Sequence, residues 1–176
     1  MLETELRRYP GTPLALRIRK NINLLSLEGK PAPALEGVAL QKEKPTLLFF
    51  WAHWCGDCRA ETPILAQIKK EFGPRGLTVI GATQKYGYIG SQTDVPPKVE
   101  ISYIEQIRKV YYAAVVDAPA VVSETNFLTY GVSTTPTIVL LDRGGIIRLY
   151  HPGGMKYGEL KAAIKGVISK PSRVQR

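Results

Sequence analysis

The sequence predicts an α/β fold in which a central mixed sheet carries helices on both faces. Continuous apolar runs of strand length alternate along the chain with longer segments whose apolar residues recur at helical spacing. Two of these runs are separated only by the Asp-Arg-Gly-Gly turn at residues 142–145, which predicts an antiparallel hairpin at one edge of the sheet. With 176 residues, 44% of them hydrophobic, the chain can bury such a sheet within one domain.

The N-terminal residues predict an arm that precedes the sheet. A short helix is expected over residues 4–9, ended by Pro10 and Gly11, and the apolar residues of 13–25 follow without a clean period. The prolines of GKPAPALEG, residues 29–37, disfavour helix and predict an extended segment. We therefore expect three parts: an arm over 1–30, a sheet domain over 31–170 and a basic tail over 171–176.

Residues 46–83 predict a strand–helix–strand unit with a parallel pair of strands. The run TLLFFWA, residues 46–52, is continuously apolar, as expected for a strand buried on both faces. Apolar residues at helical spacing predict a helix over 56–72, with a kink at Pro63. The run LTVIGAT, residues 77–83, predicts the second buried strand, and a helix between two such strands is typical of parallel pairing.

The second half of the chain predicts a helical insertion and the rest of the sheet, in the overall order βαβαβαββα. A polar stretch rich in Gly and Tyr over 84–96 leads into a helix over 97–112. Ser123 is a good N-cap for a short helix that Gly131 ends. The remaining elements are expected as strands over 113–118, 137–142 and 146–150, and helices over 124–130 and 157–169.

The charge of the chain and the length of its apolar runs limit the classes of partner and the cellular compartments that we expect. The net charge is +9, and we interpret the basic ends as solvated faces, with attraction to an acidic partner or an anionic membrane as the alternative. No basic motif interleaved with aromatic residues is present, so we expect no nucleic-acid partner. No run reaches the ~18 apolar residues of a membrane span. We expect a cytoplasmic protein if Met1 is the natural start, and otherwise a chain that has lost a leader or membrane anchor.

The two cysteines of the chain, Cys55 and Cys58, lie three positions apart, directly after the first predicted strand. A disulfide between them closes a tiny loop and stabilises little, so redox chemistry or metal binding explains the pair better. At the start of a helix, unpaired N–H groups and the helix dipole favour the Cys55 thiolate. We expect Cys55 to attack a substrate disulfide and Cys58, one turn later, to resolve the mixed disulfide.

Three motifs in this order carry a family resemblance: FFWAHWCGDC at residues 49–58, Pro63, and YGVSTTPTIVLLDRGG at 130–145. The chain resembles the thioredoxin superfamily over roughly residues 30–170. The form WCxxCRxExP, together with GKPAPAL and the insertion over residues 84–130, is most similar to the TlpA/ResA-like branch of thiol–disulfide oxidoreductases. The resemblance implies a thioredoxin-like fold, protein dithiol or disulfide substrates, an upstream electron donor, and an exported or membrane-tethered location. We also expect a monomer.

The resemblance also implies a substrate-binding surface beside the cysteines. Pro136 matches the cis-proline of the superfamily, and a cis bond there lets the backbone of Thr135 pair with an extended substrate. The alternative is that Pro136 simply begins a strand. Trp54 is expected to form an apolar lip beside Cys55. The tyrosines of the insertion are expected at the margin of a core, with a partner surface as the alternative.

Two positions depart from thioredoxin itself. Phe49 stands where thioredoxin has a buried Asp, so Glu61, one turn after Cys58, is our candidate for the base that deprotonates Cys58. The alternative is an ordinary surface Glu paired with Arg59 or a lysine. The Gly56–Asp57 dipeptide places a carboxylate between the cysteines that opposes a nearby thiolate and favours a reductant; as an alternative, Asp simply starts the helix well.

Two other functions remain open at this point. A metal-binding or redox-inactive partner-binding module would use the same fold, but a zinc site needs four ligands and the chain has only His53 and His151 besides the cysteines. We therefore expect no metal and no cofactor. A peroxidase of the peroxiredoxin kind carries Thr three residues before its cysteine, where this chain has Ala52.

Overall fold

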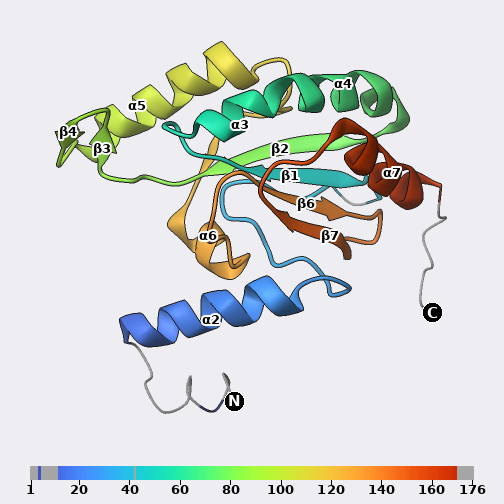
Figure 1. Cartoon of the computed structure of the whole chain (residues 1–176), viewed down its shortest axis with the longest axis horizontal. Helices are drawn as coiled ribbons and strands as arrows, with labels where there is room; N and C mark the ends of the chain where they lie inside the picture. The colour runs from blue at the N-terminus through green and yellow to red at the C-terminus, as the bar shows by residue number, and fades with distance from the viewer. Residues whose placement is uncertain (1–3, 5–11, 42, 170–176) are drawn as a thin grey trace.

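A computed structural model describes Thr4 and residues 12–41 and 43–169 of the chain. The predicted basic tail, and all of the predicted helix over 4–9 except Thr4, lie outside these residues. A five-stranded sheet of order β5–β2–β1–β6–β7 forms the centre of the molecule (Figure 1). Its strands are β1 (Thr46–Phe50), β2 (Thr78–Thr83), β5 (Val121–Val122), β6 (Thr137–Leu141) and β7 (Ile147–Pro152). Strands β2 and β5 run parallel to their neighbours, whereas β6 and β7 pair antiparallel.

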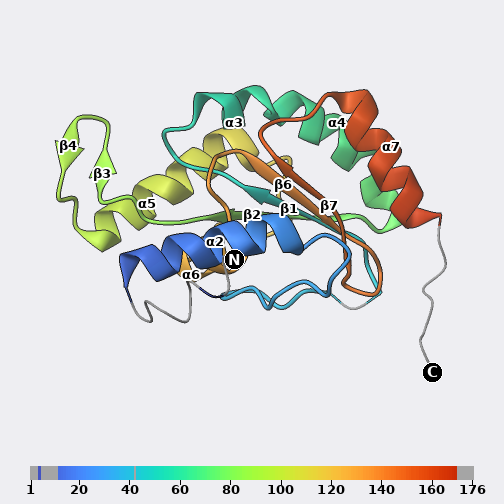
Figure 2. The ribbon, with the colours of Figure 1, turned by 60° about the horizontal axis from the view of Figure 1, so that its bottom comes forward.

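Helices cover both faces of this mixed sheet, which confirms the predicted fold class (Figures 1 and 2). One face packs against α4, α5 and α7, and the opposite face packs against α6 and the segment that leads from α2 to the sheet. The helices are α2 (Pro13–Ser26), α3 (Gly56–Ala60), α4 (Thr62–Phe72), α5 (Pro97–Ile107), α6 (Glu124–Thr129) and α7 (Tyr157–Ile168).

Strand β1 is central in the sheet and is buried along its whole length. Because side chains alternate between faces, Leu47 and Phe49 enter one core while Leu48 and Phe50 enter the other. This explains why the run is continuously apolar. The strand ends at Phe50, five positions before Cys55, and so places the cysteines at one end of the sheet.

Helix α2 was not predicted, although Ala15 and Ile18, among those of its side chains that the structure describes, are buried. The Thr12 side chain caps it by accepting a hydrogen bond from the Ala15 N–H (3.2 Å), and Pro13 begins it. Asn23 donates from its side-chain amide to the carbonyl oxygens of Leu128 (3.2 Å) and Thr129 (3.0 Å), at the end of α6. The N-terminal arm is therefore packed against the sheet domain at this point.

The predicted strand over 113–118 is wrong. The N–H groups of Val115 and Val116 bond to the Tyr112 carbonyl (2.9 and 3.0 Å), which makes this segment a turn whose apolar side chains fill the core. The edge strand is instead the two-residue β5, which pairs with the end of β2. A π-helical turn, Arg108–Tyr112, continues α5 over the rest of the helix predicted for 97–112.

Two other predicted elements are subdivided. The helix expected over 56–72 is split into α3 and α4 at Glu61, because Pro63 lies in the first turn of α4 and cannot continue the hydrogen-bond ladder of α3. Within the insertion, β3 (Tyr88–Ile89) and β4 (Gln92–Thr93) form a small separate hairpin next to α5. The predicted hairpin turn over 142–145 and the Ser123 cap of α6 are both present.

The chain that follows α2 pairs with the start of β7. The Gly29 N–H donates to the Ile147 carbonyl (2.8 Å), and the Ile147 N–H donates to the Lys30 carbonyl (3.0 Å). The Ala32 N–H then bonds to the Gly145 carbonyl (2.8 Å), and Pro31 bridges to Ile146. The segment predicted to be extended thus runs alongside the last strand.

Candidate active site

The two cysteines lie at the junction of β1 and α3 and form a disulfide. Cys55 is the N-cap of α3, and its sulfur accepts a hydrogen bond from the Cys58 N–H (3.0 Å). This is the position at which free helix N–H groups and the helix dipole stabilise negative charge on a sulfur. Cys55 is 3% exposed whereas Cys58 is fully buried, so Cys55 is the more accessible of the two cysteines.

The loop before β6 lies against the Cys55 sulfur. The peptide bond between Thr135 and Pro136 is cis, as the resemblance implies. The Thr135 carbonyl oxygen is 3.5 Å from the sulfur of Cys55, and Thr135 itself is half-buried. The Thr137 hydroxyl donates to the Thr134 carbonyl (2.8 Å) and the Gly153 N–H donates to the Pro136 carbonyl (2.8 Å), so both flanks of the bend are held.

The two tryptophans near the cysteines have different environments. Trp54 is 48% exposed, and its ring contacts Tyr86 edge-on with centroids 5.4 Å apart. Trp51 is fully buried and packs on Tyr112 with centroids 4.7 Å apart. Trp54 is thus the exposed aromatic surface next to Cys55, and Trp51 belongs to the core.

Glu61 is buried at the break between α3 and α4, so the alternative of an ordinary surface Glu is wrong. One carboxylate oxygen accepts a hydrogen bond from the Met155 N–H (3.1 Å). Burial raises the pKa of the Glu61 carboxyl, although the Met155 N–H and His151 act in the opposite direction. A Cβ on Gly154 would stand 2.5 Å from the other carboxylate oxygen, so this glycine makes room for the side chain.

The remaining predicted site residues lie on the first turn of α3 and in the core. Gly56 and Asp57 are exposed between the two cysteines. Phe49 is fully buried and packs against Tyr112 with ring centroids 5.7 Å apart, which leaves an apolar core where thioredoxin has its Asp.

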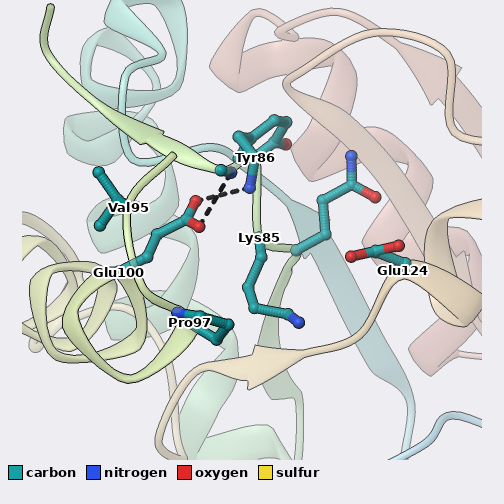
Figure 3. A pocket seen from close by; sticks show the side chains of 8 residues that line it. Lys85, Tyr86, Val95, Pro97, Glu100 and Glu124 are labelled. Carbon is teal, nitrogen blue, oxygen red and sulfur yellow. Dashed lines mark hydrogen bonds between the residues drawn. The ribbon is translucent and has the colours of Figure 1, made fainter. Parts of the chain in front are cut away.

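Sequence reasoning missed a buried pair beside the cysteines, His53 and Glu100. Each side chain is 1% exposed, and the His53 Nε2 lies 3.2 Å from a Glu100 carboxylate oxygen. The same carboxylate accepts hydrogen bonds from the N–H groups of Tyr86 (2.6 Å) and Gly87 (2.9 Å), as Figure 3 shows. One signal was available: Glu100 falls one turn before Ile104 on the apolar side of the predicted helix, where a carboxylate needs a partner.

Burial lowers the pKa of the His53 imidazole, and this outweighs the opposing hydrogen bond and charge of Glu100. The rings of Tyr86, Tyr88 and Tyr103 surround it edge-on, with centroids 5.5 to 5.6 Å away. Three tyrosines of the insertion therefore pack around the residue that precedes Trp54. Tyr112, in contrast, is fully buried in the core and not at its margin, which corrects the prediction for this residue.

A cavity of about 540 Å³ opens beside this pair, at the end of β2 (Figure 3). Its walls include Lys85, Pro97 and Glu124, and Glu100 lies at one side. Among the residues that the structure describes, no group of three or more His, Cys, Asp and Glu side chains is placed to hold a metal ion. Over the described ranges, 12–41 and 43–169, no helix is long and apolar enough to cross a bilayer.

Comparison with known proteins identifies the family. The profile of the thioredoxin-like domain matches residues 34–168. The chain belongs to the thioredoxin-like family. A thiol:disulfide interchange protein DsbE of Escherichia coli (strain K12) is 30% identical over 160 residues, which cover 84% of this chain and 77% of that protein.

Solved thioredoxin-like structures agree with this assignment. The exposed lipoprotein thioredoxin Etrx1 of Streptococcus pneumoniae strain TIGR4 is 28% identical, with a TM-score of 0.52, over 70% of this chain and 86% of its own. A DsbE protein from Chlorobium tepidum superposes with a TM-score of 0.63 over 81% of this chain and 98% of its own; at 19% identity, this shows the fold alone.

The predicted thioredoxin-like fold and the predicted enzyme class, a thiol–disulfide oxidoreductase, are both confirmed. The narrower assignment to the TlpA/ResA-like branch stays a prediction.

Proposed function

We propose that this thioredoxin-like protein acts as a reductant of protein disulfides, with Cys55 as the attacking sulfur and Cys58 as the resolving one. The observation that carries the proposal is the place of Cys55 at the N-terminus of α3, where its sulfur already accepts the Cys58 N–H (3.0 Å). A thiolate formed there keeps that hydrogen bond.

The reaction begins with the reduced dithiol. The Cys55 thiolate attacks one sulfur of the substrate disulfide, the substrate S–S bond breaks, and the first substrate thiolate leaves. Cys58, once deprotonated, attacks the Cys55 sulfur of the mixed disulfide and releases the second substrate thiolate. Two electrons have then passed to the substrate, whose thiolates take up protons, and the Cys55–Cys58 disulfide remains. An upstream dithiol donor must reduce it before the next cycle.

Glu61 is proposed as the base that takes the proton from Cys58. Cys58 is fully buried, so solvent has poor access to its thiol, and Glu61 follows one turn later with its carboxyl also buried. The raised pKa of Glu61 supports this role, because a carboxyl that titrates nearer to neutrality is a stronger base.

Substrates are proposed to bind across Trp54 and the loop of Thr135 and Pro136. A backbone next to a cis-proline can pair with an extended segment of substrate, and the half-exposed Trp54 offers apolar contact on the other side of Cys55. Asp57 supports the reducing direction, since its charge opposes the Cys55 thiolate. We further propose that the protein is a monomer. We also propose that it acts outside the cytoplasm, as the resemblance implies and as the name of the lipoprotein Etrx1 suggests for a similar protein.

The decisive experiment is the reduction of insulin by dithiothreitol, followed by turbidity. The wild-type protein should accelerate the reaction, Cys55→Ser should abolish the acceleration, and Cys58→Ser should accumulate a mixed disulfide that can be isolated on non-reducing gels. Acceleration that survives Cys55→Ser would refute the assignment of the attacking sulfur. A wild-type protein that accelerates nothing would favour a redox-inactive binding module. The reducing direction is tested separately, by measuring the reduction potential in a glutathione buffer: a potential well above that of protein disulfide isomerase, about −180 mV, would refute it.

A further inference from the structure

We propose that Glu100 is a positioning residue of this reaction: through His53 and Tyr86 it ties the insertion to the active-site loop, residues 51–55 between β1 and α3, and holds Trp54 in the geometry that protein substrates require. The inference rests on the proposed function and adds a role for a residue of the insertion, 45 positions after Cys55 in the chain.

Glu100 is buried, and its carboxylate accepts hydrogen bonds from three donors. Its carboxylate accepts from the N–H groups of Tyr86 (2.6 Å) and Gly87 (2.9 Å) and from the His53 ring (3.2 Å). A carboxylate oxygen accepts hydrogen bonds from N–H groups, so the third contact requires the His53 ring to carry a proton on Nε2. A buried carboxylate without such partners would cost several kcal/mol, and the three contacts offset this cost.

His53 is held from two directions. Its side chain contacts Glu100, and its carbonyl oxygen accepts a hydrogen bond from the Arg59 guanidinium (2.9 Å) on α3. The Arg59 guanidinium also stacks over the ring of Tyr111, 4.7 Å from its centroid. The residue two positions before Cys55 is therefore fixed both to the catalytic helix and to the insertion.

The Glu100 carboxylate supports Trp54 through two of its neighbours. In the chain it follows His53, and in space its exposed ring contacts Tyr86, whose N–H bonds to Glu100. Loss of the carboxylate would release both supports of the Trp54 ring while leaving the cysteines and the cis-Pro136 loop in place. Because reaction rates depend steeply on how a large substrate is oriented, this release should impair protein substrates far more than small ones.

The test compares two disulfides that differ in size, insulin and 5,5′-dithiobis(2-nitrobenzoate). We expect Glu100→Gln to lower kcat/KM for insulin at least fivefold, while the rate of the reduced protein with the small aromatic disulfide stays within twofold of the wild type. Glu105→Gln is the matched control on the same helix: its carboxylate pairs with Arg108, away from the active-site loop, and neither rate should change. His53→Phe keeps an aromatic ring but removes the N–H donor, and should reproduce the Glu100→Gln pattern.

Urea denaturation of each variant verifies that it is folded under the assay conditions, and His53→Phe replaces Glu100→Gln if the latter does not fold. Equal insulin activity in wild type and the folded variants would overturn the inference, as would a proportional loss with both disulfides, which indicates general damage to the site. A wild-type protein inactive toward both probes would instead overturn the proposed function, and the inference with it.

Discussion

Replacement of Gly131 by Ala should disturb the turn after α6 and also the packing of α2 against it. Gly131 follows α6 with φ +67°, and a Cβ there would stand 2.5 Å from the Leu24 nitrogen and 2.6 Å from the Lys20 carbonyl oxygen. Both atoms belong to the backbone of α2, so the helix as a whole must move away. The structure therefore predicts that this single methyl group detaches α2 from the end of α6.

The magnitude follows from two contributions. The left-handed backbone costs an L-residue roughly 1–2 kcal/mol. Displacement of α2 also breaks the hydrogen bonds from the Asn23 side chain to Leu128 and Thr129, each worth about 1 kcal/mol. We expect Gly131→Ala to lower the free energy of unfolding by about 3–4 kcal/mol, which is a large part of the total stability of an ordinary domain.

Gly76→Ala provides the matched control. Gly76 also has a positive φ (+91°), but nothing lies within 4 Å of its Cβ position, so only the backbone contribution of about 1–2 kcal/mol applies. Urea denaturation followed by circular dichroism measures both variants. Equal losses would refute the reasoning. A second result would also refute it: a protease cleaves α2 selectively in Gly131→Ala, yet this variant unfolds at the same urea midpoint as Gly76→Ala. In that case α2 would be an independent arm whose packing does not contribute to the stability of the domain.

Three further predictions concern the active site. The pKa of Glu61 is raised on folding, so between the ordinary Glu pKa and the raised pKa the folded protein binds more protons than the unfolded chain. The unfolding free energy of the wild type should therefore rise relative to that of Glu61→Gln as the pH falls through this window. A difference in unfolding free energy that stays constant in urea denaturation from about pH 8 to about pH 4 would contradict this. Asp57→Asn should raise the reduction potential by about 10–20 mV in a glutathione buffer, since an exposed charge contributes less than about 1 kcal/mol; an unchanged potential would show that the carboxylate has no influence. Trp54→Ala should raise the KM for insulin about tenfold and leave the unfolding free energy within about 1 kcal/mol, because the residue is 48% exposed; an unchanged KM would exclude Trp54 from the binding surface.

The strand and the helix start that carry the cysteines could be predicted because local chemistry determines both. A continuous apolar run such as TLLFF is stable only when both faces are covered, and the chain after it must leave the sheet. Ser123 and Gly131 likewise mark the ends of α6 through capping and a left-handed residue, which depend on few neighbours. The cis-proline was different: it came from the resemblance, since the residues alone also allowed a strand start.

The features that sequence reasoning missed depend on contacts between distant parts of the chain. Helix α2 has apolar residues without a clean period, and only its Thr12–Pro13 start and its packing on α6 define it. Val115 and Val116 have strand propensity, yet in the folded protein they lie in a turn and their side chains pack into the core. No local pattern could pair His53 with Glu100, which lie 47 residues apart.

The pairing at the start of β7 also bears on self-association. A sheet edge with free N–H and C=O groups is a template on which a second copy can add a strand, and proteins avoid aggregation by shortening or blocking such edges. Here residues 29–32 already take up hydrogen-bonding groups at the start of β7, and the opposite edge is the two-residue β5. Solutions of this protein should therefore tolerate high concentration without forming cross-strand dimers or fibrils, unless the stretch between α2 and β1 is cut.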